Sequence, residues 1–518
     1  MPMEQSSLTF QTFKNISYNI IGYIWPMIFT LFVTPVIIYS LGVKGYGIYL
    51  FVYTIIGLLS ILDFGVGISI TRNLAYYHGK GDSEAVTRLV YNGNSLFLIV
   101  SVVGTLCAMV MFLVGHFAPN ILPASFAEYS QYLSLIFLAG LIFFVNTIDT
   151  TYTAILYSMQ RFDISNGISI VSITLSSLGT LAVVLMKGSL QEIFIVQLVT
   201  SIIITCVTIY YGMKILPQAK FRFAWDNAIM KDCLSFSAAI SINNLANNAL
   251  TYLDRLIIPF FAGPSSLTYY SIPGNVTTRI PSFSNILSAT MFPTTSQLEG
   301  GGDKARLEIL YVRSFRLITM ISAAVTVTAI AFGYKVLLYW LNADFATHSA
   351  KILTILALTN FILALFGPLS NFLFGLGKLK FIATMSSVMA VFNAILLIIL
   401  LPKFGIEGAA WAYLISMLPV AYMFYYTEKH YLTLTNRKHY YTKKILATII
   451  SSALVWAVDI YVISPFVKSL TTLLVAGILS VLLYVFIYRI FGFLEDEDWR
   501  DIKNFITLGL KKLIRRNK

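Results

Sequence analysis

Charged residues are scarce in this chain. Only 11% of its 518 residues are Asp, Glu, Lys or Arg, whereas a soluble domain carries roughly 25%. Hydrophobic residues make up 57% of the chain, and its mean hydropathy is +0.78. Side chains this apolar exclude an ordinary soluble protein, because most of them must face lipid or other apolar helices.

Cysteine is scarce as well, with three residues in all, each in or at the end of an apolar segment. Cys107, Cys206 and Cys233 have no spacing that suggests a disulfide framework or a metal site. We therefore expect no metal and no cofactor. We also expect no cleavable signal, because the apolar run from Ile16 to Leu41 is too long and no small-residue cleavage site follows it.

What the chain does contain is a series of long apolar runs. About 20 apolar residues are needed to cross roughly 30 Å of hydrocarbon as a helix. We therefore predict an all-α polytopic membrane protein with about fourteen transmembrane helices. They lie near residues 16–41, 46–70, 90–115, 131–157, 165–187, 191–215, 233–262, 267–293, 318–341, 350–375, 381–401, 407–427, 445–463 and 469–491.

The basic residues indicate how these helices are oriented. The net charge is +13, and most Lys and Arg lie in the short connections that follow even-numbered helices. Such a bias marks the cytoplasmic side, so we place both termini in the cytoplasm of a cell (inner or plasma) membrane. Basic residues confined to short loops argue against nucleic acid. The loops are also too short for a soluble catalytic domain, so we expect a protein that is not an enzyme.

Two parts of the chain resemble each other at an offset of about 217 to 221 residues. Pro35–Gly42 resembles Leu256–Gly263, and Leu156–Phe162 resembles Leu373–Leu379. Both halves begin in the cytoplasm, so the repeat is parallel. Parallel repeats are typical of transporters, with the substrate site between the halves near the midplane.

The repeat predicts how the chain is divided. Two six-helix bundles, joined by a cytoplasmic linker, precede two extra transmembrane helices and a C-terminal tail. The tail has apolar residues at helical spacing and ends in basic residues, which is typical of an amphipathic helix on anionic membrane lipids; a solvated charged tail is the alternative. The predicted boundaries are 1–216 and 233–427 for the bundles, 217–232 for the linker, 428–491 for the basic loop and extra helices, and 492–518 for the tail.

Polar residues form stripes on several of the predicted helices. Such side chains either join helices by hydrogen bonds or line a water-accessible cavity. Because the stripes are long and some carry charges, we favour a cavity that binds substrate. The stripe residues are Ser237, Ser241, Asn244, Asn248 and Arg255; Ser271, Asn275, Thr278, Ser282 and Asn285; Asn146, Asp149, Thr153 and Tyr157; and Tyr53, Ser60 and Asp63.

Arg279 is the most informative of the charged positions. It lies near the centre of a predicted span, where an arginine facing lipid costs about 2.5–3.5 kcal/mol. Pro273 and Pro281 flank it and predict a broken helix. A cation beside such a break predicts an anion site. The alternative is a structural ion pair with Asp254, Asp63 or Asp149.

Arg255 and Asp63 have two interpretations each. Arg255 is a second candidate for the anion site, although Asp254 is its neighbour in sequence. Asp63 either binds a coupling cation or pairs with an arginine, and we favour the pairing.

The residues also resemble a known family. Pro35–Tyr49, Leu62–Gly67 and Arg72, with Tyr252–Arg255 in the second half, resemble the polysaccharide biosynthesis membrane proteins, the Wzx-type O-antigen and capsule flippases. The resemblance implies the multidrug/oligosaccharidyl-lipid/polysaccharide exporter fold and alternating access. It implies an oligosaccharide on a polyprenyl pyrophosphate as substrate, with a polysaccharide polymerase or glycosyltransferases as partners. Fourteen helices depart from the twelve common among these flippases.

Three other functions remain as alternatives. A lipid II flippase of the same superfamily shares the fourteen helices. A cation-coupled drug exporter is disfavoured because residues 16–41 contain no acidic side chain. A membrane glycosyltransferase or polymerase is disfavoured because only Glu128 and Asp344 lie in the short outer loops.

Overall fold

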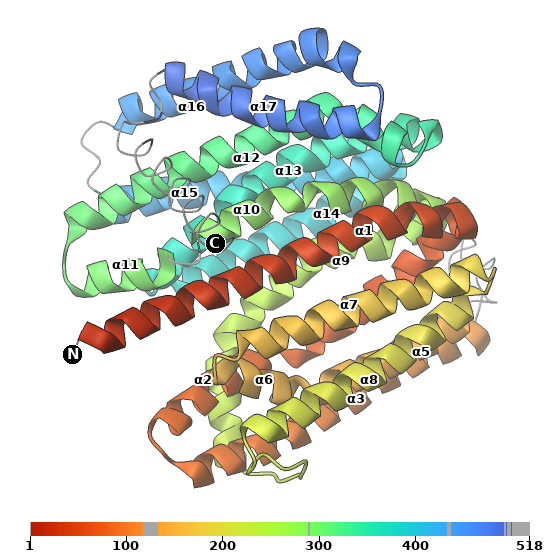
Figure 1. Ribbon diagram of the computed structural model, residues 1–518, viewed down its shortest axis with the longest axis vertical. Helices are drawn as coiled ribbons and strands as arrows, with labels where there is room; N and C mark the ends of the chain where they lie inside the picture. Colours follow the sequence, from red (N-terminus) through yellow and green to blue (C-terminus); the bar gives the residue numbers. More distant parts are fainter. Residues whose placement is uncertain are drawn as a thin grey trace, which may run out of the picture. The chain divides into compact units, whose positions relative to one another are not determined.

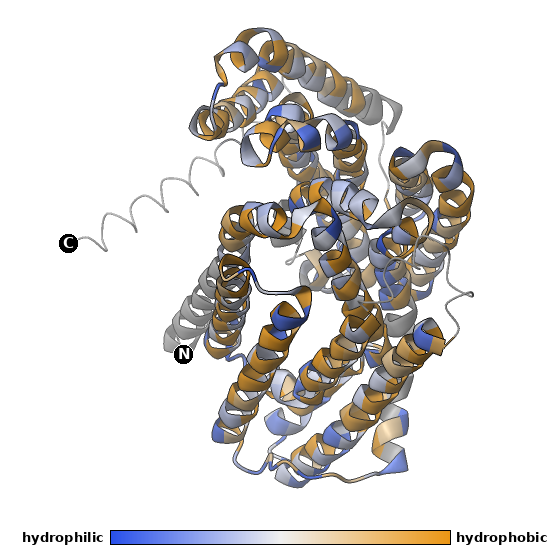
Figure 2. Ribbon diagram, turned by 90° about the vertical axis from the view of Figure 1, so that its right-hand side faces the viewer, coloured by the Kyte–Doolittle hydropathy of each residue, from blue (hydrophilic) through white to orange (hydrophobic). Residues whose placement is uncertain are grey.

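The computed structural model describes residues 2–117, 133–288, 291–432 and 437–491, together with Leu494 and Trp499. Within these ranges the regular elements are all helices (Figure 1). Ten of the described helices are long and apolar enough to cross a membrane. Figure 2 shows apolar residues along the lengths of the helices and hydrophilic residues gathered at their ends. The prediction of an all-helical, multi-pass membrane protein is confirmed.

The chain forms two compact units, residues 1–268 and 269–518. In the first unit α7 packs against α1 and α8, and α5 packs against α3 and α8 (Figure 1). Its elements are α1 (Pro2–Leu59), η1 (Ser60–Asp63), α2 (Val66–Gly79), α3 (Ser83–Phe117), α5 (Leu133–Ile148), α6 (Thr150–Ser158), α7 (Phe162–Leu185), α8 (Leu190–Ile215) and most of α9 (Asn227–Thr277).

In the second unit α12 packs against α13, and the α16–α17 hairpin packs against α12. The elements that follow α9 are α10 (Arg279–Ser288), α11 (Met291–Gly300), α12 (Lys304–Trp340), α13 (Ala343–Gly375), α14 (Leu379–Ser416), α15 (Leu418–Tyr431), α16 (Arg437–Val458), η4 (Asp459–Ile463), η5 (Ser464–Phe466) and α17 (Leu470–Ile490). The predicted tail helix lies outside the described residues, apart from Leu494 and Trp499.

Two of the longest helices are broken at a glycine. In α1, Gly42 has φ 70° and ψ 168°, and in α9, Gly263 has φ 79° and ψ 167°. Glycine adopts positive φ without the steric cost that other residues pay, so each helix is two segments that change direction there. The same break therefore occurs twice, at the offset of about 221 residues that the sequence resemblance predicted.

A second backbone feature recurs at the same offset. Gly81 (φ 74°) and Gly302 (φ 70°) end a helix–turn segment, and Asp82 and Asp303 follow them. Each aspartate accepts a hydrogen bond from the backbone N–H three residues further on, at 2.9 and 3.0 Å, and so caps the next long helix. These matches support the internal repeat, whereas the predicted bundle boundaries stay predictions.

The predicted linker has no regular helix between Ile215 and Asn227, and its backbone is bonded to side chains of α3. The side chain of Ser95 accepts a hydrogen bond from the Ala224 backbone N–H at 2.9 Å, and Asn92 accepts one from the Asp226 N–H at 2.6 Å. The Asn94 amide donates to the Arg222 carbonyl oxygen at 3.2 Å. Three polar side chains of α3 therefore satisfy the linker's backbone.

We predict that adding one methyl group at Gly47 destabilises the first unit. A Cβ there would lie 2.0 Å from the Pro264 carbonyl oxygen, and a backbone oxygen cannot move aside as a flexible side chain can. Gly47→Ala should cost about 1–3 kcal/mol and lower the melting temperature of the purified protein. Gly167→Ala, where a Cβ meets open space, is the control. Equal melting temperatures for the two variants would contradict the close approach.

Candidate functional site

A buried carboxylate lies at a break in the fourth predicted span. Helix α5 ends at Ile148 and α6 begins at Thr150, with Asp149 between them at φ −93° and ψ 1°. The Thr150 hydroxyl donates to the Thr147 carbonyl oxygen at 2.8 Å, one of the local bonds by which threonine competes with regular helix. Although Asp149 is charged in water, its side chain is only 9% exposed here.

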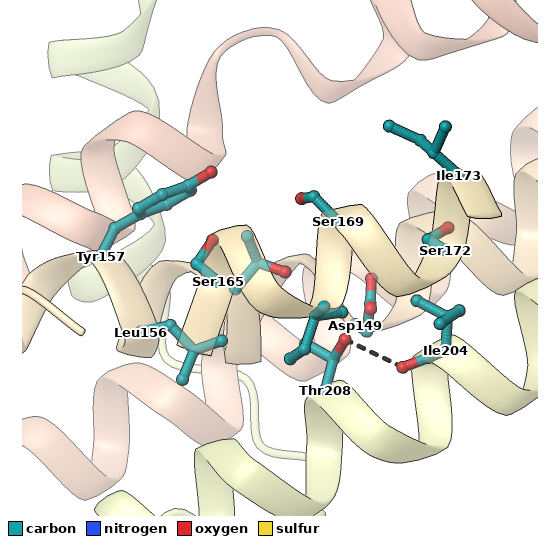
Figure 3. Close-up of a pocket in the computed structure, with 11 residues that line it drawn as sticks. Asp149, Leu156, Tyr157, Ser165, Ser169, Ser172, Ile173, Ile204 and Thr208 are labelled. Atoms are coloured by element: carbon teal, nitrogen blue, oxygen red, sulfur yellow. Dashed lines mark hydrogen bonds between the residues drawn. The ribbon is translucent and has the colours of Figure 1, made fainter. Parts of the chain in front are cut away.

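Asp149 lines a pocket of about 250 Å³ among α6, α7 and α8 (Figure 3). Hydroxyl groups surround the carboxylate, and neither lysine nor arginine is among the lining residues. The Thr208 hydroxyl lies beside Asp149 and donates to the Ile204 carbonyl oxygen at 2.9 Å. The lining residues are Asp149, Thr153, Leu156, Tyr157, Ser165, Ile168, Ser169, Ser172, Ile173, Ile204 and Thr208.

This pocket suits a ligand that donates hydrogen bonds. A carboxylate accepts through two oxygens, and each hydroxyl can both donate and accept. Because no basic side chain competes for Asp149 among the lining residues, the ligand itself must supply donors or a positive charge. A polyhydroxyl compound or a small cation fits that requirement.

The sequence predicted part of the pocket. Asp149, Thr153 and Tyr157 belong to one predicted stripe and line it, whereas Asn146 of that stripe is exposed and lies outside it. The break at Asp149 separates Asn146 from the rest, because residues before and after it no longer share one helical face.

The stripes predicted from the sequence do not include three serines of α7 that line the pocket. Ser165, Ser169 and Ser172 are spaced four and three residues apart, so they occupy one face of the helix, and all three line the pocket. That spacing was visible in the sequence and could have identified them.

The second unit contains the break that the sequence predicted around Arg279. Helix α9 ends at Thr277 and α10 begins at Arg279. Pro273 has no N–H to donate to the Tyr269 carbonyl oxygen one turn earlier, and the Ser349 hydroxyl of α13 donates to that oxygen instead, at 2.8 Å. The break is therefore held from outside the helix.

A second contact from α13 secures the other side of the break. The Thr277 hydroxyl donates to the Pro273 carbonyl oxygen at 3.0 Å, and the Asn360 amide donates to the Thr277 hydroxyl at 3.1 Å. Asn360 is only 3% exposed and Thr277 1%. Buried hydrogen bonds of this kind fix the end of α9, and hence the point at which α10 begins.

Arg279 is the first residue of α10 and is half-buried. Within the described part of the second unit, no carboxylate lies within ion-pair distance of it. The first turn of a helix also presents unsatisfied N–H groups and the positive end of the helix dipole. A guanidinium at that position is suited to bind a phosphate group.

The remaining predicted residues are distributed over both units. Asn244, Asn248 and Arg255 lie half-buried on α9 in the first unit, and Asn275 is half-buried on α9 in the second. None of them lines the Asp149 pocket.

Asp63 ends η1. One of its carboxylate oxygens accepts a hydrogen bond from the Gly67 backbone N–H at 3.4 Å. Within the described part of the first unit no arginine forms an ion pair with it, and its pairing with an arginine of the second unit stays a prediction.

Comparison with known proteins identifies relatives over most of the chain. The sequence profile described as polysaccharide biosynthesis protein matches residues 12–299, and the profile described as MatE matches residues 239–399. A Shigella flexneri protein named "Putative O-antigen transporter" is 22% identical over 406 residues, which cover 78% of this chain and 94% of the relative.

Solved structures share the fold. The lipid II flippase MurJ in an inward closed conformation superimposes with a TM-score of 0.67 at 12% identity, covering 94% of this chain and 99% of MurJ. An inward-facing multidrug resistance MATE family transporter superimposes with a TM-score of 0.60 at 14% identity, covering 79% of this chain and 97% of the transporter.

We predict that the Asp149 pocket is accessible to water. In a variant without the three native cysteines, Ser169→Cys should react with a water-soluble maleimide, because the reactive thiolate forms in water. Thr180→Cys is the control, since Thr180 is 1% exposed and bonded to Gln197 at 2.8 Å. Labelling of the introduced cysteine is measured in the folded protein, in liposomes that the reagent can enter so that it reaches both sides of the membrane. The measurement is repeated after denaturation. A Ser169→Cys variant that reacts only after denaturation would contradict a wet pocket.

Proposed function

The chain belongs to the polysaccharide biosynthesis protein family, and from this premise we propose that it is a flippase for a lipid-linked oligosaccharide. The substrate is an O-antigen, capsule or exopolysaccharide repeat unit on a polyprenyl pyrophosphate. The protein moves it from the cytoplasmic to the outer leaflet by alternating access. The family consists of membrane transporters, so the chain catalyses no chemical step.

The observation that carries this proposal is Arg279 at the break between α9 and α10. A pyrophosphate needs cations or N–H donors once it leaves water, and a guanidinium can pair with two phosphate oxygens at once. The side chain is half-buried and has no carboxylate partner in the described part of its own unit. It therefore has the charge and the hydrogen-bonding capacity that a pyrophosphate requires.

The chemistry of the Asp149 pocket supports the proposal that the substrate carries a sugar. Its hydroxyls and carboxylate match the hydroxyl groups of a carbohydrate, and its volume of about 250 Å³ suits a small group rather than a whole oligosaccharide. We assign one sugar residue to it. We keep the predicted candidates Asn244, Asn248 and Arg255 of the first unit, and Asn275 of the second, as proposed contacts for polar groups of the substrate.

The helix breaks bear on the architecture. Of the ten described spans, Leu379–Tyr431 contains the break at Gly405, and the span that belongs to α1 contains the break at Gly42. Counting each of these two spans as two membrane crossings gives twelve, and adding α9 with α10 as two more gives fourteen. We propose two six-helix halves followed by the α16–α17 hairpin.

A lipid II flippase is the second candidate. The superposition on MurJ covers 94% of this chain, and its substrate by name is also a lipid. Drug export is the third, from the fold shared with the MATE family transporter. The three candidates differ in substrate, so a transport assay with each substrate separates them.

We predict that Arg279→Ala strongly slows transport of the sugar lipid. One lost hydrogen bond to a charged group costs about 1.5–3 kcal/mol, so the rate should fall roughly tenfold or more. Arg279→Lys should retain part of the activity, because it keeps the charge but not the paired geometry. Exchange between leaflets is followed in liposomes by the accessibility of the sugar to a membrane-impermeant reagent.

Arg306→Ala is the matched control, since Arg306 lies in the same unit but is exposed and paired with Asp303. Normal transport by Arg279→Ala would contradict the anion site. If wild-type protein transports lipid II but not the oligosaccharide lipid, or exports drugs down an ion gradient, the corresponding alternative replaces the proposal.

A further inference from the structure

The C-terminal hairpin contains a carboxylic acid buried within the membrane-spanning part of the chain. Asp459 is 0% exposed and lies in the span Ile445–Phe466. It begins η4, a single π-turn in which the Ser464 N–H donates to the Asp459 carbonyl oxygen five residues earlier. Such π-turns are rare and are frequently found at functional sites.

Asp459 joins three helices through a short chain of contacts. Its Oδ2 lies 2.6 Å from the Ser480 Oγ of α17, and this Oγ lies 2.7 Å from the Thr328 Oγ1 of α12. The Thr328 Oγ1 lies 2.9 Å from the Ala324 carbonyl oxygen, to which it donates. Ser480 is 0% exposed as well.

Counting hydrogen bonds shows how little the carboxyl group receives. The Ser480 hydroxyl donates to the Asp459 Oδ2, and the Thr328 hydroxyl lies between the Ala324 carbonyl oxygen and the Ser480 Oγ. The carboxyl group is therefore bonded through one oxygen. An ionised carboxylate with so few partners is costly to bury, whereas a protonated acid is neutral.

The surroundings of the acid agree with this count. Among the described residues, the Asp459 Oδ1 is buried without a hydrogen-bond partner. Lys335 of α12 donates to the carbonyl oxygens of Ser464 and Val467 instead.

The two tyrosines nearby bond to other groups as well. On α12, Tyr339 donates to the Val467 carbonyl oxygen at 3.1 Å. On α17, the Tyr484 hydroxyl lies 3.4 Å from the Ser452 Oγ. No described base therefore contacts Asp459, and an ionised carboxylate there would have no counter-charge.

We propose that Asp459 is a proton-binding site that locks the α16–α17 hairpin onto α12. The proton sits on the carboxyl group, which accepts the hydrogen bond from Ser480. Loss of that proton to water leaves a buried carboxylate without a counter-charge, so the hairpin loosens.

The test is infrared difference spectroscopy of the purified protein over a pH series. At a pH at which exposed carboxyl groups are already ionised, the wild type should still show the C=O stretch of a protonated carboxyl group and lose it as pH rises further, and Asp459→Asn should lack the Asp459 contribution to that band. Ser480→Ala should move the midpoint by about one pH unit. Glu428→Gln, which removes another buried carboxyl group, should keep the band. Ser451→Ala, which removes a buried hydroxyl of α16, should leave the midpoint unchanged.

Amide hydrogen exchange provides the second readout. Exchange in α17 should accelerate at the pH at which the band disappears, beyond the ordinary pH dependence shown by α5, and Asp459→Asn should abolish that extra step. A band that is unchanged in Asp459→Asn would show an acid that is always ionised. A band that persists at every pH at which the protein stays folded would show a purely structural acid. Either result overturns the proposal, and Ser480→Ala provides the same comparison if Asp459→Asn fails to fold.

Discussion

Hydrocarbon provides no hydrogen-bond partner, so every polar group inside the membrane must be satisfied by the protein itself. Most of this chain meets the constraint with uninterrupted helices. Where Pro273 removes a backbone donor, a side chain replaces the missing bond, because Ser349 donates to the carbonyl oxygen that Pro273 leaves free.

The same constraint places the ionisable groups. Asp149 lies between α5 and α6, Arg279 begins α10, and Asp459 begins a π-turn. Each is at an interruption, where backbone geometry and neighbouring hydroxyls can accommodate a polar side chain that a continuous apolar helix could not. We infer that two of these interruptions receive parts of the substrate and that the third receives a proton.

Much of the fold could be predicted because composition and glycine positions act locally. Apolar runs predicted the all-helical membrane class, and the resemblance between residues 35–42 and 256–263 led to glycines with nearly the same φ and ψ. Pro273 and Pro281 located the break at Arg279, since proline acts on its own helix. Each of these features depends on residues close to it in the sequence and not on contacts with distant helices.

The sites were harder to predict because they depend on contacts between distant segments. Ser165, Ser169 and Ser172 have the same spacing as ordinary interhelical hydrogen-bonding serines, and only the approach of Asp149 makes them a pocket. Asp459 lies within the predicted span 445–463, where an acid is a visible signal, but its partners Ser480 and Thr328 lie on other helices and could not be predicted. Asn146 belongs to the Asp149 stripe in sequence, but the break removes it from the pocket.

The central claim is that this protein recognises a pyrophosphate that carries a sugar. The most direct measurement is native mass spectrometry of the purified protein with three lipids: polyprenyl pyrophosphate with the oligosaccharide, polyprenyl pyrophosphate alone, and the polyprenyl alcohol. We expect affinity to fall at each step, first when the sugar is removed and again when the pyrophosphate is removed. Equal binding of all three lipids would contradict the claim, because the protein would then recognise only the hydrocarbon tail.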